Sequence, residues 1–221
     1  MNLTKKISSN QYSSKTLTAS KLVQASYCLT YKKFINSVIN ENDSVLDIGF
    51  GYGFLKPLIK KKGALYTGIE GNKIAFSCAQ RLYGRSGFLL GFFPEDLTIK
   101  KKYNVLISLT TLDQVENKSY FIKSLIKFSD TNSDVYISVR NKSSIFGGLG
   151  AGFDLLDLSV EEWHNLFNAN GFEVVECSKL PRPWIIGVSF NAFKNVVITS
   201  IDRLVPTNLA YMILFKLKVS L

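Results

Sequence analysis

The sequence has little of what disulfide frameworks, metal centres and membrane spans require. It contains three cysteines, an odd number, at the widely separated positions Cys28, Cys78 and Cys177, which fits neither a set of disulfides nor a zinc site. No apolar run approaches the roughly 18 residues of a membrane-spanning helix. Residues 1–15 are polar and lack the apolar core of a signal peptide. We therefore expect reduced thiols, no bound metal ion and a cytoplasmic location.

Acidic residues are scarce in the first half of the chain. Residues 1–102 hold 16 Lys and Arg against 6 Asp and Glu, whereas residues 103–221 hold 11 against 11, so the first half carries the net charge of +10. Such a surface could attract nucleic acid, anionic lipid or a phosphorylated substrate. The lysine runs 60–62 and 100–102 fall at the sheet edge away from the expected ligand side. They are better interpreted as a solvated face, and nucleic acid is not the expected partner.

The pattern of apolar residues predicts an α/β fold. Residues 1–15, rich in Ser, Asn and Lys, indicate a disordered tail, and residues 16–221 a single domain. Apolar residues at helical spacing predict one or two helices within residues 16–40. Strands are then expected at 44–48, 65–70, 88–90, 104–108, 135–139, 172–177 and 211–218, and helices at 54–62, 73–83, 118–128 and 160–168. This alternation predicts a doubly wound, mostly parallel, seven-stranded sheet.

The segment Val45–Gly53 carries the strongest functional pattern. A predicted strand enters a turn with Gly49, Gly51 and Gly53, which permit unusual backbone angles and close approach of a ligand. The helix that follows would present its free N–H groups to that ligand. The dinucleotide fingerprint needs its third glycine at the position that Phe54 occupies here. Asp47 also precedes the turn, where its carboxylate would repel a pyrophosphate and suit a cationic ligand.

A second acidic residue, Glu70, ends the next predicted strand. A carboxylate there can accept two hydrogen bonds from a ribose diol, and NAD-binding folds use the same position. Glu70 therefore indicates an adenosine-type cofactor without choosing among them. The early third glycine and Asp47 favour a cofactor with a positively charged amino-acid part.

The pattern Asp47-x-Gly49-x-Gly51-x-Gly53, followed by Glu70, resembles motif I and the acidic loop of class I S-adenosylmethionine-dependent methyltransferases. Segments 103–108, 112–115, 161–175 and 211–216 resemble later parts of the same family. The resemblance implies a Rossmann-like sheet with an antiparallel last strand, and methyl transfer that leaves S-adenosylhomocysteine. It implies cofactor contacts from Asp47, Gly49, Phe50, Gly51, Gly53, Glu70, Gly71, Asn72, Phe92, Phe93, Asp96, Ser108 and Leu109.

Two positions depart from the family pattern. After the third strand the family often has Gly-Asp-Ala, whose Asp meets the adenine amino group. Here Gly91 is followed by Phe92 and Phe93, so the adenine contact is expected from the backbone or from Asp96. Gln114 stands where a histidine is common, which leaves its role open.

The acceptor should bind beyond the carboxyl ends of the strands. Segment 141–158, with a glycine-rich run at 147–152, and the apolar insertion 181–208 both begin on that side. The insertion could cap a hydrophobic or lipid-linked acceptor, pack on the sheet edge, form a dimer contact, or touch a membrane surface through residues 184–205. The oligomeric state stays open.

Methyl transfer from a sulfonium relies mainly on positioning, and a general base is needed only where the acceptor must lose a proton. No catalytic residue can be assigned; the candidates are His164, Asp154, Asp157, Tyr12, Tyr27 and Tyr31. The chain lacks an Asn/Asp-Pro-Pro-aromatic box after the fourth strand and a Pro-Cys nucleophile. The sequence thus predicts methylation of a small molecule or a glycan or lipid intermediate. The alternatives are an NAD(P)-dependent oxidoreductase and a non-catalytic scaffold of the same fold.

Overall fold

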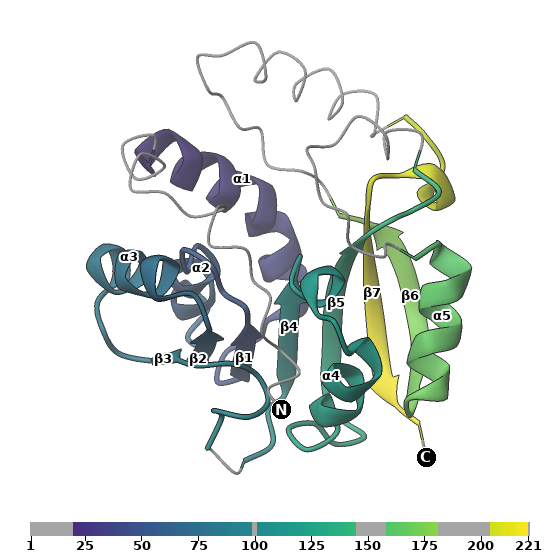
Figure 1. Cartoon of the computed structure of the whole chain (residues 1–221). Coiled ribbons are helices and arrows are strands. Elements are labelled where there is room, and N and C mark those ends of the chain that lie inside the picture. The colour runs from purple at the N-terminus through teal and green to yellow at the C-terminus, as the bar shows by residue number, and fades with distance from the viewer. Residues whose placement is uncertain (1–19, 99–100, 145–157, 181–203, 221) are drawn as a thin grey trace.

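The computed structural model of the chain describes residues 20–98, 101–144, 158–180 and 204–220, with side chains from residue 28 onward. Its helices and strands follow one another as helix α1, then strands and helices in alternation (Figure 1). The strands are β1 (Ser44–Ile48), β2 (Leu65–Glu70), β3 (Phe88–Leu90), β4 (Val105–Leu109), β5 (Asp134–Arg140), β6 (Phe172–Lys179) and β7 (Met212–Val219). The helices are α1 (Ser20–Val38), α2 (Leu55–Lys61), α3 (Lys73–Tyr83), α4 (Lys118–Leu125) and α5 (Val160–Ala169), with short 3-10 turns η3 (Leu112–Gln114) and η5 (Thr207–Leu209).

The seven strands form one sheet in the order β3-β2-β1-β4-β5-β7-β6. All neighbouring pairs are parallel except those of β7, which runs antiparallel to both β5 and β6. This arrangement confirms the predicted doubly wound, seven-stranded sheet with an antiparallel last strand. The carboxyl ends of β1, β2, β4 and β5 therefore meet along one edge of the sheet.

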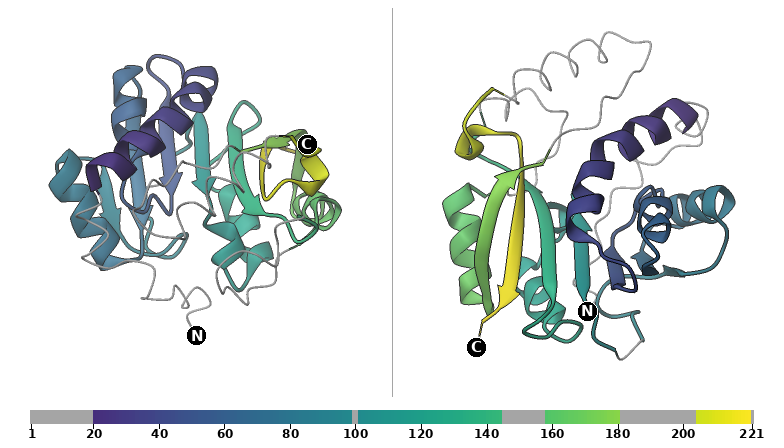
Figure 2. Two further views of the ribbon diagram at one scale, coloured as in Figure 1. Left: turned by 90° about the horizontal axis from the view of Figure 1, so that it is seen from above. Right: turned by 180° about the vertical axis from the view of Figure 1, so that it is seen from behind.

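Helices cover both faces of the sheet and bury two separate apolar clusters (Figures 1 and 2). On one face, α1, α2 and α3 enclose a cluster that includes Ile35, Ile59 and Tyr66. On the other face, α4 and α5 enclose a cluster that includes Phe121 and Trp163. Side chains alternate between the faces along each strand, which is why neighbouring residues of β1 belong to different clusters.

Local signals account for where several helices begin and end. The Asn72 side chain accepts hydrogen bonds from the backbone N–H groups of Ile74 and Ala75 and so starts α3. Ser159 and Glu162 form a reciprocal capping box at the start of α5. Gly171, with φ of 86°, then allows the chain to turn into β6.

The structure differs from the predicted elements at a few places. A single helix, α1, occupies the stretch for which one or two helices were predicted, and α4 ends three residues before Phe128. The predicted tail 1–15, the glycine-rich run 147–152 and most of the insertion 181–208 lie outside the described residues. Among the helices that the structure describes, none has the length and apolar character needed to cross a bilayer.

The described lysines of the two runs lie at the sheet edge opposite the carboxyl ends. Lys60 and Lys61 form the last turn of α2, where cations favour the helix dipole. Lys102 donates hydrogen bonds from Nζ to the carbonyl oxygens of Ile126 and Ser129, just past the end of α4. These contacts give the basic residues structural roles at helix ends.

Candidate active site

The turn after β1 is a tight left-handed path that only glycine adopts easily. Gly49, Gly51 and Gly53 have φ values of 73°, 55° and 75°. A Cβ on Gly49 would collide with the side chain of Thr111, and one on Gly53 would lie 2.8 Å from Cζ of Phe88. The Gly49 N–H donates to the Ile69 carbonyl oxygen at 2.8 Å. The turn is thus packed between β2 and the loop after β4, with its backbone close to the carboxyl edge.

Glu70 ties this turn to the loop after β2. It is 3 % exposed, and its Oε2 accepts a hydrogen bond from the Gly51 N–H while Oε1 accepts one from the Asn72 N–H, each at 2.8 Å. Burial raises the pKa of Glu70, and the backbone N–H groups oppose that rise. The carboxylate therefore sits at the end of β2 with both oxygens oriented by backbone donors of two loops.

Asp47 lies below the turn, on the face of the sheet covered by α1 and α2. It is 2 % exposed, and its Oδ2 accepts a hydrogen bond from the Tyr66 hydroxyl at 2.9 Å. Burial raises the pKa of Asp47 to about 7; the Tyr66 hydrogen bond lowers it, and the charge of Glu70 raises it further. Near neutral pH this carboxyl therefore stands close to its titration midpoint.

Several of the remaining residues predicted to hold the cofactor lie in the loops after β2 and β3. Gly71, Asn72 and Phe92 lie together around the ends of β2 and β3, since a Cβ on Gly71 would meet the Phe92 ring. The exposed Asp96 accepts a hydrogen bond from the Phe92 N–H at 2.8 Å within the loop after β3. Phe50 instead packs against Phe88 in the apolar cluster beside Asp47.

Three predicted residues occupy the opposite face or the far side of β1. Phe93 belongs to the apolar cluster under α4, where its ring packs against Phe121 and Phe128. Ser108 and Leu109 end β4, next to β1, and the Ser108 hydroxyl is buried without a hydrogen-bond partner in the described structure. A buried hydroxyl of this kind is uncommon and is consistent with a ligand-facing position.

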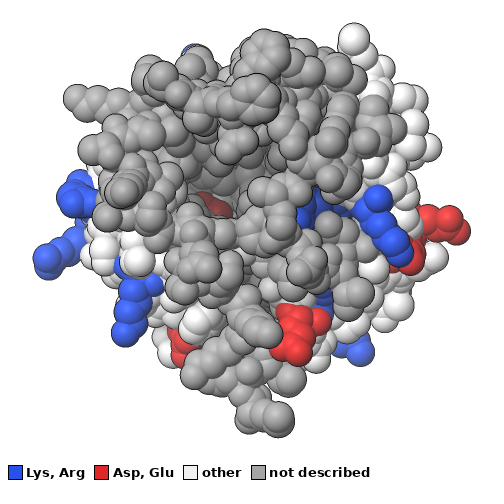
Figure 3. Space-filling model, turned by 45° about the horizontal axis from the view of Figure 1, so that its top comes forward, with Lys and Arg blue, Asp and Glu red and all other residues white. Residues whose placement is uncertain are grey.

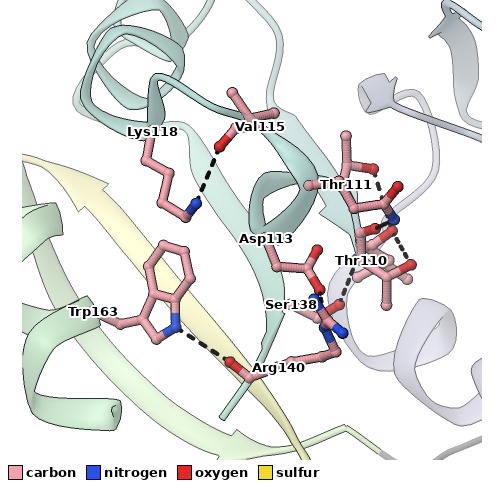
Figure 4. Close-up of polar contacts among 10 residues, drawn as sticks. Thr110, Thr111, Asp113, Val115, Lys118, Ser138, Arg140 and Trp163 are labelled. Carbon is pink, nitrogen blue, oxygen red and sulfur yellow. Dashed lines mark hydrogen bonds and ion pairs between the residues drawn. The ribbon is translucent and has the colours of Figure 1, made fainter. Parts of the chain in front are cut away.

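A second polar cluster, which sequence analysis missed, lies at the ends of β4 and β5 (Figure 4). Asp113 in η3 forms an ion pair with Arg140 at the end of β5, with Oδ2 2.9 Å from Nε, and the two side chains are 3 % and 13 % exposed. The Trp163 indole N–H donates to the Arg140 carbonyl oxygen at 3.3 Å. The Asp113–Arg140 pair could not be predicted from the sequence, because it forms only when the loop after β4 folds back toward β5.

The loop between these clusters is held in an uncommon conformation. Thr110 has a φ of 57°, which β-branched residues rarely adopt. Its N–H donates to the Ser138 hydroxyl at 3.0 Å, and its carbonyl oxygen accepts from Nε2 of Gln114 at 2.7 Å. Thr111 donates from Oγ1 to the Ile48 carbonyl oxygen at 3.3 Å, next to the glycine turn. Gln114 thus stabilises the loop that joins the two polar clusters.

Figure 3 shows this edge of the molecule obliquely, with acidic side-chain atoms visible near the centre of the view. Within the described residues, no group of three or more His, Cys, Asp and Glu side chains is arranged to hold a metal ion.

Comparisons with known proteins agree with this geometry. No family model matches the chain. The ubiquinone biosynthesis O-methyltransferase of Pelagibacter ubique (strain HTCC1062) is 27% identical over 166 residues, covering 70% of this chain and 68% of that protein.

Two solved methyltransferases share the fold. The plantazolicin methyltransferase with bound S-adenosylhomocysteine has a TM-score of 0.62 at 18% identity, over 91% of this chain and 86% of that one. The magnesium protoporphyrin IX methyltransferase of Synechocystis PCC 6803 with bound S-adenosylmethionine has a TM-score of 0.57 at 18% identity, over 90% and 85%.

The chain has the fold of class I S-adenosylmethionine-dependent methyltransferases and is distantly similar in sequence to one of them. The sheet also argues against the dinucleotide alternative, because Rossmann dehydrogenases continue 3-2-1-4-5-6 whereas here an antiparallel strand enters between β5 and β6.

The structure places the predicted catalytic candidates apart from one another. The His164 ring lies edge-on to Phe215, between α5 and β7, which is the opposite end of the sheet from the glycine turn. Tyr31 is buried in the apolar cluster between α1 and the sheet. Tyr27 lies on α1 in the part whose side chains are not described, and Tyr12, Asp154 and Asp157 lie outside the described residues. The catalytic assignment stays a prediction for each of them.

Proposed function

We propose that this methyltransferase binds S-adenosylmethionine across the ends of β1 and β2 and transfers its methyl group to a hydroxyl oxygen of a small or lipid-linked molecule. The observation that carries the proposal is the pair of buried carboxylates, Asp47 and Glu70, placed on either side of the left-handed glycine turn. Two buried carboxylates favour a ligand that brings positive charge and hydrogen-bond donors.

The residues present fit such a cofactor. Within the described residues, Tyr66 is the only hydrogen-bond donor to Asp47, which leaves Oδ1 for the ammonium group of the amino-acid part. The Glu70 carboxylate accepts backbone N–H groups of Gly51, Gly71 and Asn72, and its two oxygens offer about four lone-pair positions, which leaves capacity for a ribose hydroxyl. Gly71 leaves space that the Phe92 ring enters, which provides an apolar wall near the adenine.

The chemistry needs little from protein side chains. The bound cofactor supplies a methyl group on a sulfonium, which is already activated for in-line displacement. Asp47 would hold the ammonium group of the cofactor and Glu70 its ribose, and the two contacts together would position the methyl group for transfer. In such a transfer the acceptor oxygen would gain the methyl group as the C–S bond breaks, its proton would pass to solvent, and the thioether S-adenosylhomocysteine would be the second product. The Thr110–Thr111 loop packs against the glycine turn, where Thr111 Oγ1 donates to the Ile48 carbonyl oxygen, and so supports the turn in place.

The acceptor class rests on a distant relationship. The Pelagibacter relative is named for ubiquinone biosynthesis and for O-methylation, and it aligns with two thirds of this chain. That name supports a hydroxyl oxygen as acceptor and a lipid-linked molecule as one acceptor type. The segments predicted to cover the acceptor, 141–158 and 181–208, begin at the same edge as the proposed cofactor site, since Asn141 directly follows β5 and Leu180 directly follows β6.

Two measurements test the proposal. Calorimetry with S-adenosylhomocysteine, S-adenosylmethionine and NAD should show micromolar binding of the first two and none of NAD. Transfer of labelled methyl groups should then be assayed with polyhydroxylated aromatic acceptors, with and without a prenyl chain, and with matched aromatic amines and thiols. Binding of NAD alone would refute the cofactor assignment, and methylation confined to amines or thiols would refute the acceptor assignment.

A further inference from the structure

The buried Tyr66 hydroxyl donates a hydrogen bond to the buried Asp47 carboxylate from the neighbouring strand. The two residues come from neighbouring parallel strands, and the register pairs Asp47 with Gly68, two residues beyond Tyr66 on the same face of β2. The Tyr66 hydroxyl donates to Oδ2 of Asp47 at 2.9 Å, and both side chains are buried. A tyrosine of the apolar cluster therefore occupies one oxygen of the carboxylate.

Gly68 makes this contact possible. A Cβ at position 68 would lie 2.5 Å from the Tyr66 hydroxyl oxygen and 2.7 Å from Cδ1 of Phe50. Both distances are too short for a real side chain, so any larger residue would displace the Tyr66 ring or the Phe50 ring. The missing side chain opposite Asp47 is what lets the hydroxyl reach the carboxylate.

We propose, on the basis of the cofactor function proposed above, that Tyr66 is a positioning residue: its hydroxyl holds the Asp47 carboxylate ionised and turned so that Oδ1 receives the ammonium group of the cofactor. The hydroxyl occupies Oδ2, so rotation of the carboxyl would break a buried hydrogen bond. Since the cofactor is cationic, its affinity depends on how much of the Asp47 carboxyl is ionised.

The groups around Asp47 set the direction of the pH effect. From β2, Tyr66 lowers the pKa of Asp47 through its hydrogen bond and Glu70 raises it through its charge. From α1 and α2, the apolar cluster on this face of the sheet includes Tyr31 and Leu55. Burial is the largest influence and brings the pKa of Asp47 to about 7. Removing the Tyr66 hydroxyl therefore moves the titration of Asp47 to higher pH.

The test is the pH dependence of ligand affinity in the full-length protein. S-adenosylhomocysteine should bind about tenfold more weakly for each pH unit below about 7, because the ionised fraction of Asp47 falls by that factor. In Tyr66→Phe the midpoint of this profile should move up by about one pH unit, the size expected for losing one hydrogen bond to a charged group. Gly68→Ala should shift it in the same direction. Tyr83→Phe, which removes a hydroxyl beside the same cluster, should leave the midpoint in place.

A second ligand separates ionisation of Asp47 from general damage to the site. 5′-Methylthioadenosine keeps the adenosine part and lacks the ammonium group, so its affinity should be flat from pH 5.5 to 8.5 in wild type and Tyr66→Phe alike. An unchanged S-adenosylhomocysteine midpoint in a folded Tyr66→Phe variant would overturn the role of Tyr66, as would an equal loss of affinity at every pH. Failure of wild type to bind either ligand at any pH would instead overturn the proposed cofactor function.

Discussion

The substitution Asp47→Asn should make the protein more stable and its cofactor binding weaker. Asp47 is buried, and burial raises its pKa from the ordinary 3.8 to about 7. The folded protein therefore holds a proton on Asp47 that the unfolded chain releases between pH 4 and pH 7. A carboxyl with a raised pKa destabilises the fold as pH rises through that range, and the loss is complete above about pH 7. Asparagine removes this penalty and can still accept the Tyr66 hydrogen bond.

The magnitude follows from the two pKa values. The stability difference between Asp47→Asn and wild type should grow by about 2–3 kcal/mol between pH 5 and pH 8, because each pH unit of unequal proton binding contributes about 1.4 kcal/mol. Urea unfolding of both proteins at four pH values measures it. Glu95→Gln, at an exposed carboxylate in the loop after β3, serves as control and should show no growing difference. Lower stability of Asp47→Asn at pH 8, or a difference that does not change with pH, would refute the assignment of a buried titrating carboxyl.

Three other substitutions probe the elements around the site. Glu70→Gln should destabilise the ligand-free protein by about 1–3 kcal/mol, because the carboxylate accepts backbone N–H groups with both oxygens and glutamine has only one. Denaturant titration checks this, and unchanged stability would limit Glu70 to ligand contact. Gly49→Ala should cost more than Gly84→Ala, since both have positive φ but only Gly49 faces Thr111, and thermal melts of the two variants give the difference. Lys56→Met should lose about 2–3 kcal/mol, because Nζ donates to three carbonyl oxygens between α3 and β3; S-adenosylhomocysteine affinity, measured by calorimetry, should stay within threefold of wild type.

Sequence periodicity and turn residues predicted the first half of the fold closely. The ranges 44–48, 65–70, 73–83 and 88–90 agree with β1, β2, α3 and β3, because glycines and the Asn72 cap mark their ends. The helix predicted to reach Phe128 ends at Leu125, since the chain tightens there into i to i−3 hydrogen bonds such as Phe128 N–H to the Leu125 carbonyl. Apolar spacing does not distinguish those tighter turns from helix.

The site was predicted only as far as local motifs reach. Asp47, the three glycines and Glu70 stood out because their chemistry is tied to strand ends. Tyr66 and Arg140 did not, because nothing local marks them: Tyr66 reaches Asp47 through the register of two strands, and Arg140 reaches Asp113 through a loop with a left-handed threonine. Pairings of this kind are set by tertiary structure.

The two polar clusters differ in a way that bears on ligand choice. Asp113 forms an ion pair with Arg140, so the pair carries no net charge. Removal of either side chain would leave the other as an unpaired buried charge. Asp47 and Glu70 have no ion-pair partner among the described residues, and the charge of Glu70 raises the pKa of Asp47. A ligand that brings positive charge to this site would therefore reduce the repulsion between the Asp47 and Glu70 carboxylates. The protein should bind S-adenosylhomocysteine, with its ammonium group, more tightly than 5′-methylthioadenosine, and the margin should shrink in Asp47→Asn because the repulsion is then already gone.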